Sequence, residues 1–176
     1  LRELQEEYAP GGYFFLNDTL NISKQYVNEL CDGIIKSKTH VLWSDCARAD
    51  NLDRYTLFKM RQAGCIRLIF GMETASPGLL KYVDKRIGLI GLENTLKWAD
   101  EAGIWTGLEV ICGLPHEKEA DIEETAAFLN RNKEYINTLY FNQFDLRDGS
   151  VLLENAKALG IENIIELNQY ANEEFN

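Results

Sequence analysis

Short apolar runs alternate along the chain with segments whose apolar residues recur at helical spacing. Five runs have the length of buried strands, and they cover residues 13–16, 40–44, 65–71, 104–112 and 136–144. Helical spacing predicts helices over residues 1–8, 23–35, 53–63, 76–83, 92–102, 120–130 and 151–159. Strands that alternate with helices through short loops form a parallel sheet with right-handed crossovers. The pattern therefore predicts an α/β fold, in one domain because no internal linker is rich in Ser or Pro.

Local signals refine two of these helices. Asp53 has the side chain of a helix N-cap directly before an apolar-periodic segment. The helix over 120–130 carries Ile122, Ala126 and Leu129 three or four residues apart. We expect these three side chains to face the core.

The composition is that of a globular domain with an acidic charge. The 176 residues are 45% hydrophobic and 26% charged, so a core of useful size can form. The net charge is −10, and no cluster of basic residues relieves it, so this chain is not expected to bind nucleic acid. No apolar run has membrane-spanning length, so membrane binding is not expected either. The chain begins with Leu inside a predicted helix, and we expect it to be a piece of a longer protein.

Four cysteines, at positions 31, 46, 65 and 112, are too far apart in the sequence to form a metal-binding pair. Cys31, Cys65 and Cys112 lie in apolar segments and are predicted to be buried free thiols. Free thiols are typical of a reducing compartment, so a cytoplasmic location is expected.

Polar residues and glycines follow each predicted strand. In a parallel sheet the carboxyl ends of the strands share one edge, and ligands bind there. The candidates at this edge are Asn17, Asp18, Asp45, Arg48, Asp50, Gly71, Glu73, the segment 113–117, Asp145, Arg147 and Asp148.

Two of these residues stand out. Glu73 follows an apolar strand directly, where a carboxylate is costly unless it is paired. Gly113 ends another apolar strand, and a glycine there lets a flat ligand or another backbone approach closely. A simple turn before Pro115 would explain Gly113 equally well.

Five longer segments, in order and with matching spacing, carry a family resemblance. They are FFLNDTLN, VLWSDCARAD, MRQAGCIRLIFGMETASPGLLKYVDK, AGIWTGLEVICGLPHEKEADIEET and FDLRDGSVLLENAKALGI. Together they resemble the core domain of radical S-adenosylmethionine (SAM) enzymes. The similarity is greatest to the branch with cobalamin-binding and methylthiotransferase-type members, and it covers the chain from about Phe14 to Ile161.

The resemblance implies a partial, open (β/α) barrel in which a CxxxCxxC loop after the first strand holds a [4Fe–4S] cluster. This sequence has no such motif. We therefore expect a core truncated at its N-terminus, with the missing strand within ~40 residues before Leu1. Residues 1–176 would be one partial barrel, with βα units in 1–161 and a tail in 162–176.

The implied cofactors are SAM and a [4Fe–4S] cluster whose ligands lie outside this chain, with cobalamin a further candidate for the parent protein. The implied reaction is the reductive cleavage of SAM to a 5′-deoxyadenosyl radical, for which this piece alone would be inactive. The substrate is not indicated. The strand over 13–16 would form an apolar sheet edge, through which we expect self-association.

The resemblance also implies SAM-binding roles for eight residues. Asn17 and Asp18 match the methionine end, and Arg48 is a candidate partner of the SAM carboxylate. Glu73 matches the acid that accepts hydrogen bonds from the ribose hydroxyls. The adenine side is matched by Ile111, Cys112, Gly113 and Leu114. No residue of the chain is expected to act catalytically or to bind a metal.

Three other interpretations stay open. An ordinary barrel lyase or metal-dependent hydrolase would use Asp18, Glu73 and His116, although the chain has only two histidines and no paired histidine spacing. A non-catalytic interaction domain would keep the barrel and bind no SAM. A doubly wound nucleotide-binding sheet would need a glycine-rich phosphate motif, which the sequence lacks.

Overall fold

The computed structural model describes residues 1–17, 19–146 and 148–161. The chain divides into two compact units, Leu1–Gln143 and Phe144–Asn176, and each is described by itself. Asp18, Arg147 and the predicted tail 162–176 lie outside the described residues. The division into one domain with βα units and a tail stays a prediction.

The first unit is built on a five-stranded parallel sheet. Its strands lie side by side in the order of the sequence, and they are β1 (Tyr13–Phe15), β2 (Trp43–Ala47), β3 (Cys65–Glu73), β4 (Trp105–Cys112) and β5 (Thr138–Gln143). Sequential order with right-handed crossovers brings successive helices to the same face of the sheet. Such a singly wound sheet is the arrangement of a (β/α) barrel and excludes a doubly wound sheet. The predicted open barrel is confirmed.

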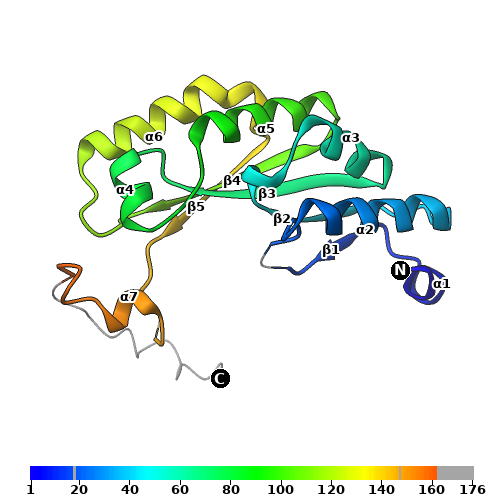
Figure 1. Cartoon of the computed structure of the whole chain (residues 1–176), viewed down its shortest axis with the longest axis horizontal. Helices are drawn as coiled ribbons and strands as arrows, with labels where there is room; N and C mark the ends of the chain where they lie inside the picture. The colour runs from blue at the N-terminus through cyan, green and yellow to red at the C-terminus, as the bar shows by residue number, and fades with distance from the viewer. Residues whose placement is uncertain (18, 147, 162–176) are drawn as a thin grey trace, which may run out of the picture. The chain divides into compact units, whose positions relative to one another are not determined.

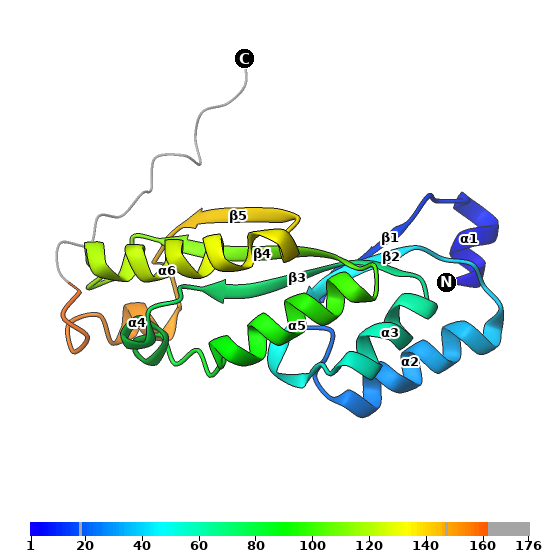
Figure 2. The same cartoon turned by 90° about the horizontal axis from the view of Figure 1, so that it is seen from above.

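One helix precedes the first strand of this unit, and the others connect successive strands. The helices are α1 (Arg2–Tyr8), α2 (Lys24–Ser37), α3 (Arg54–Gln62), α4 (Pro77–Tyr82), α5 (Leu89–Glu101) and α6 (Glu119–Asn132), with short 3₁₀ turns at Ala49–Asn51 and Lys133–Tyr135. Figures 1 and 2 show α3, α5 and α6 gathered along one face of the sheet. The second unit contains α7 (Val151–Glu154), which is shorter than the predicted 151–159. Within the described ranges, no helix is long and apolar enough to cross a membrane.

The predicted strand over 40–44 begins later than expected, at Trp43, and extends to Ala47. Trp43 is the first residue of β2 in register with both neighbouring strands, opposite Tyr13 and Cys65. Strand pairing therefore sets this boundary, whereas the apolar run alone suggested an earlier start.

The core lies between the sheet and its helices. Alternate positions of β3 and β4 are buried there, and they are Leu68, Phe70, Met72, Leu108 and Val110. The buried helix residues that complete this core include Leu57, Met60, Leu92 and Leu96. Residues between these positions on the strands, such as Gly71 and Glu109, consequently face the opposite side of the sheet, which we call the open face.

The buried face of α6 differs from the prediction. Leu129 is half-buried against the core as expected, but Ile122 is 56% exposed and Ala126 is also exposed. Thr125 is buried instead, because its hydroxyl accepts a hydrogen bond of 3.0 Å from the backbone N–H of Ala75. This hydrogen bond to the loop after β3 fixes a rotation of α6 that apolar spacing did not reveal.

The cysteine prediction is confirmed for two residues and wrong for one. Cys31 and Cys65 are buried, and burial raises the pKa of both thiols, that of Cys31 to about 11. Cys112 is exposed, because it is the last residue of β4 and extends past the buried part of the strand.

Asp53 caps α3 as predicted. Its Oδ1 accepts hydrogen bonds from the backbone N–H of Thr56 at 2.8 Å and from the Thr56 hydroxyl at 2.7 Å, while Lys24 pairs with Oδ2. The Lys24 ammonium, together with the Thr56 donors, lowers the pKa of Asp53 to about 2. A lowered pKa stabilises the fold above the pKa of the unfolded state, about 4, and this stabilisation is lost as the pH falls toward 2.

Replacing Asp53 with alanine should lower the free energy of unfolding by about 1 kcal/mol at neutral pH, because the cap is lost. The difference from the wild type should shrink between about pH 4 and pH 2, where the carboxylate is protonated. Urea unfolding at several pH values measures both effects. Asp53→Asn is the control, because it keeps a capping oxygen without a titrating charge. A wild-type advantage that is constant from pH 7 to pH 2 would contradict the assignment.

Candidate functional site

The carboxyl ends of the five strands meet at one edge of the sheet, which we call the rim. Asn17 follows β1, Arg48 follows β2, Glu73 ends β3 and Gly113 follows β4. The parallel pairing thus brings four of the predicted site residues to one edge. Asp145 and Asp148, also expected there, belong to the second unit and are not placed relative to the rim.

Glu73 has its carboxylate over the open face. The pairing of β3 with β4 is irregular between Gly71 and Glu73, and Glu73 has a positive φ of 69°. A β-carbon on Gly71 would lie 2.7 Å from Glu73 Oε1, so the glycine makes room for this side chain. A positive φ at a non-glycine residue stores strain and is typical of functional sites.

The carboxylate of Glu73 is paired, as a carboxylate at the end of an apolar strand should be. Lys85, three residues beyond α4, places its Nζ 2.7 Å from Glu73 Oε1, and only about a fifth of each side chain is exposed. Glu109 is paired with Gly71 on the neighbouring strand β4, and its Oε2 lies 3.7 Å from the same β-carbon position. Burial and the charge of Glu73 raise the pKa of Glu109, against the opposing effect of Lys85. These three residues form the Glu73–Lys85–Glu109 cluster.

The backbone of Gly113 is exposed, with open space on the side where a side chain would lie. Its φ is +81°, and apart from its two chain neighbours no described residue has a heavy atom within 4 Å of the position that a β-carbon would occupy. Its backbone N–H donates a hydrogen bond of 2.7 Å to Glu117 Oε2. The space over Gly113 is therefore open to a flat ligand, although a ligand that takes this N–H must displace Glu117.

The other three residues predicted on the adenine side differ in burial. Leu114 is buried and anchors the turn, and Ile111 is half-buried on the open face, since its neighbour Val110 faces the helices. Cys112 is exposed beside them. The turn therefore has one anchoring side chain, and its backbone stays accessible at Gly113.

Two of the residues predicted at the methionine end, Asn17 and Arg48, already have partners in the chain. The side-chain amide of Asn17 donates to Asp45 Oδ2 at 2.7 Å, and Asp45 is fully buried. Arg48 makes a two-point ion pair with Asp50, through Nε at 3.0 Å and Nη2 at 2.8 Å, which lowers the pKa of Asp50. Any contact of Arg48 with a ligand must compete with Asp50.

Sequence reasoning missed two residues that organise the rim. Asn21 is fully buried and exchanges hydrogen bonds with the backbone of Arg48, at 2.6 and 2.7 Å, which ties the loop after β1 to the loop after β2. Lys85 lay inside a quoted family segment but received no role. The position of Lys85, a positive charge twelve residues after Glu73 and beyond a short helix, could have indicated the ion pair between them.

Two of the interpretations require a metal site, for which the described residues do not supply the ligands. Among them, no group of three or more His, Cys, Asp or Glu side chains could hold a metal ion. The described part of the chain therefore does not itself fit a [4Fe–4S] cluster, and the metal-dependent hydrolase finds no ligand set there. The open backbone at Gly113, with the Glu73 carboxylate on the neighbouring strand, does fit a nucleoside.

Two curated proteins are similar in sequence to this chain, whereas no family model matches it. An uncharacterized methyltransferase of Pyrococcus horikoshii is 26% identical over 128 residues, which are 73% of this chain and 28% of that protein. The anaerobic magnesium-protoporphyrin IX monomethyl ester cyclase of Rubrivivax gelatinosus is 30% identical over 124 residues, 69% of this chain and 22% of that protein. The chain thus spans about a quarter of the length of these relatives.

Solved structures with the same fold are radical SAM enzymes. The methyltransferase TsrM from Kitasatospora setae, solved with tryptophan and a SAM analogue, has a TM-score of 0.72 at 15% identity and matches 80% of this chain and 28% of its own. The cobalamin-dependent enzyme OxsB has a TM-score of 0.66 at 17% identity, over 90% of this chain and 24% of its own. Coproporphyrinogen III oxidase from Escherichia coli has a TM-score of 0.57 at 19% identity, over 70% of this chain and 29% of its own.

The fold is therefore that of the core domain of radical SAM enzymes, and the resemblance seen in the sequence is confirmed. Cobalamin-dependent members are among the enzymes that share it, as the same resemblance indicated. The roles of the eight rim residues stay predictions.

Proposed function

We propose that this chain is the SAM-binding part of a radical SAM enzyme, which cleaves SAM reductively with a [4Fe–4S] cluster held outside this chain. The observation that carries the proposal is the placement of Glu73 over the open face, one strand away from the uncovered backbone of Gly113. The fold shared with TsrM, OxsB and coproporphyrinogen III oxidase supports the same class.

The separation of Glu73 and Gly113 suits the length of an adenosyl group. Glu73 is in register with Val110, three residues before Gly113 on the neighbouring strand. With a rise of about 3.3 Å per residue and strands about 4.8 Å apart, Glu73 and Gly113 are separated by roughly 10 Å. One ligand can thus place its ribose at the carboxylate and its adenine over the glycine.

Each rim residue would contribute binding or orientation. Glu73 accepts hydrogen bonds from the ribose hydroxyls, and Lys85 holds its carboxylate in place and balances its charge. Gly113 leaves room for the adenine ring, and Arg48 can turn from Asp50 to the SAM carboxylate. Asn17 orients the loop at the methionine end through Asp45. The electron that cleaves SAM is supplied by the cluster, so the chemistry belongs to the cofactors and the chain supplies the site.

The proposal is tested by titrating SAM and adenosine into the chain in a calorimeter. Both should bind weakly and should compete, because the rim recognises the adenosyl end while the cluster holds the rest. The parent protein with its cluster restored should convert SAM into methionine and 5′-deoxyadenosine under reducing conditions. Absence of SAM binding by both proteins would favour the non-catalytic interaction domain.

Several properties of the parent protein follow as proposals. Cobalamin is a candidate cofactor, supported by the fold shared with the cobalamin-dependent OxsB and with TsrM. The buried free thiols Cys31 and Cys65 support a reducing compartment such as the cytoplasm. Direct binding of nucleic acid or a membrane by this chain is disfavoured by its charge of −10 and by the absence of a long apolar run.

We further propose that the chain self-associates through β1. This strand ends the sheet, and the adjoining Leu16 is 88% exposed. An unprotected edge strand pairs readily with another strand, and a charged side chain beside it opposes this pairing.

Light scattering over a range of protein concentrations should therefore show dimers or larger species for the wild type. Leu16→Lys should be more monomeric, whereas Ile90→Lys, a substitution of an exposed apolar residue on α5, should behave as the wild type does. A monomeric wild type at high concentration would refute the prediction.

A further inference from the structure

A cavity of about 610 Å³ lies on the open face, toward the amino ends of the strands. Arg67 of β3 lines it, six residues before Glu73 on the same strand. At about 3.3 Å per residue, Arg67 is roughly 20 Å from the rim. The cavity is therefore separate from the proposed SAM site, and nothing in the proposed function uses it.

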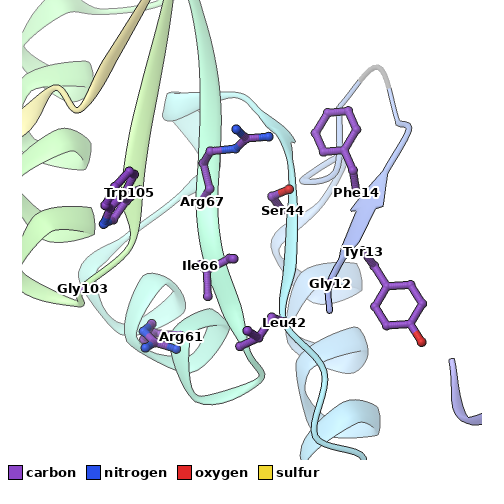
Figure 3. A pocket seen from close by; sticks show the side chains of 10 residues that line it. All are labelled: Gly12, Tyr13, Phe14, Leu42, Ser44, Arg61, Ile66, Arg67, Gly103 and Trp105. Atoms are coloured by element: carbon purple, nitrogen blue, oxygen red, sulfur yellow. The ribbon is translucent and has the colours of Figure 1, made fainter. Parts of the chain in front are cut away.

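The register of four strands builds the floor of this cavity. Phe14, Ser44, Arg67 and Trp105 are paired in one row across β1, β2, β3 and β4. Figure 3 shows Arg67 extending from β3 toward Ser44 and Phe14, with Trp105 on its other side. A single guanidinium thus lies between two aromatic residues that are substantially exposed, Phe14 by 43% and Trp105 by 64%.

The charge of the lining is opposite to that of the chain. Among the described residues, those that line the cavity include two arginines, Arg61 and Arg67, and no aspartate or glutamate. The whole chain, by contrast, has 28 acidic and 18 basic residues. A cavity that concentrates positive charge within an acidic protein is suited to an anion.

Arg67 lacks an acidic partner within the described residues. None of the ion pairs between them involves Arg67, and its buried Nε has no hydrogen-bond acceptor. The guanidinium lies over the ring of Phe14, whose centroid is 5.8 Å from the guanidinium carbon. A buried donor without an acceptor destabilises a protein. A ligand that brings an acceptor to this guanidinium would remove that cost.

We propose that this cavity binds a flat, apolar organic carboxylate, with the carboxylate on Arg67 and the apolar ring against Trp105 and Phe14. The guanidinium fork matches a carboxylate with two parallel hydrogen bonds. The volume and the apolar lining with few polar groups are those of a small-molecule site. A phosphate is less suited, because its higher charge calls for more donors than this lining presents.

The test compares 1-naphthoate with the neutral 1-naphthamide, which has nearly the same shape, by calorimetric titration of the chain. Naphthoate should bind roughly 10-fold or more tightly than naphthamide, because only naphthoate forms the charged pair. Arg67→Met should remove most of this difference, and Arg67→Lys should keep part of it. Arg131→Met, which removes an exposed arginine from α6, should leave it unchanged.

Equal binding of the two probes, unchanged selectivity in Arg67→Met, or no binding of naphthoate at millimolar concentration would each overturn the proposal. A wild-type dimer that Arg67→Met separates into monomers would also overturn it, since polypeptide would then cover this face. Thermal unfolding of each variant checks that it is folded, and Arg67→Lys keeps the test decisive if the methionine variant is not. SAM binding should be unaffected by Arg67→Met, so this proposal and the proposed function fail separately.

Discussion

Replacing Gly113 with leucine should weaken the binding of SAM by roughly 100-fold, because the new side chain would fill the space assigned to adenine. Within the described part of the chain, only the two chain neighbours of Gly113 can come within 4 Å of the β-carbon position. The substitution should also destabilise the chain by about 1–2 kcal/mol, because a leucine must adopt the positive φ of 81°. Calorimetric titration and urea unfolding measure the two effects separately.

Gly33 provides the matched control. It too has open space around its β-carbon position, but it lies within α2 without a positive φ. Gly33→Ala should therefore stabilise the chain by about 0.5–1 kcal/mol and leave SAM binding unchanged. If Gly113→Leu binds SAM as well as the wild type does, adenine does not lie over this glycine.

Glu73→Gln should weaken SAM binding by roughly 10- to 100-fold, because a charged acceptor for the ribose hydroxyls is replaced by a neutral one. The same change leaves Lys85 without its partner at 2.7 Å, so part of the loss could come from a displaced lysine. The double variant Glu73→Gln with Lys85→Met distinguishes the two causes. Binding should stay weak in the double variant if Glu73 itself contacts the ribose.

Glu123→Gln, on the exposed part of α6, should bind SAM as the wild type does and controls for the loss of one negative charge. Competition by 2′-deoxyadenosine gives an independent readout. The wild type should prefer adenosine to 2′-deoxyadenosine, and Glu73→Gln should lose most of that preference. Full recovery of SAM binding in the double variant would show that Glu73 acts only by neutralising Lys85.

The α/β class and the candidate rim were predictable because both depend on features that are local in the sequence. Alternating apolar runs and helical spacing define βα units, and parallel strands necessarily share a carboxyl edge. Glu73 and Gly113 were conspicuous for the same reason, as a carboxylate and a bare glycine at the ends of apolar strands. The structure leaves open space over Gly113 and places the Glu73 carboxylate over the open face of the neighbouring strand.

Other features depend on contacts between segments far apart in the chain. The burial of Thr125 follows from its hydrogen bond to Ala75, fifty residues away, so the rotation of α6 could not be predicted from its own spacing. The pairing of Glu73 with Lys85 depends on how the chain returns after α4. Cys112 is exposed because it lies at the end of β4, past the part of the strand that is buried. Its apolar neighbours in the sequence therefore wrongly suggested a buried thiol.

The sequence by itself determined the order of strands and helices, the cap at Asp53 and the composition of the rim, because periodicity, capping and turn preferences act over a few residues. The tertiary structure alone decided strand register and helix rotation, and with them the Glu73–Lys85–Glu109 cluster and the row that contains Arg67. Register and rotation are set by packing and hydrogen bonding across the sheet, where a shift of one residue moves a side chain to the other face.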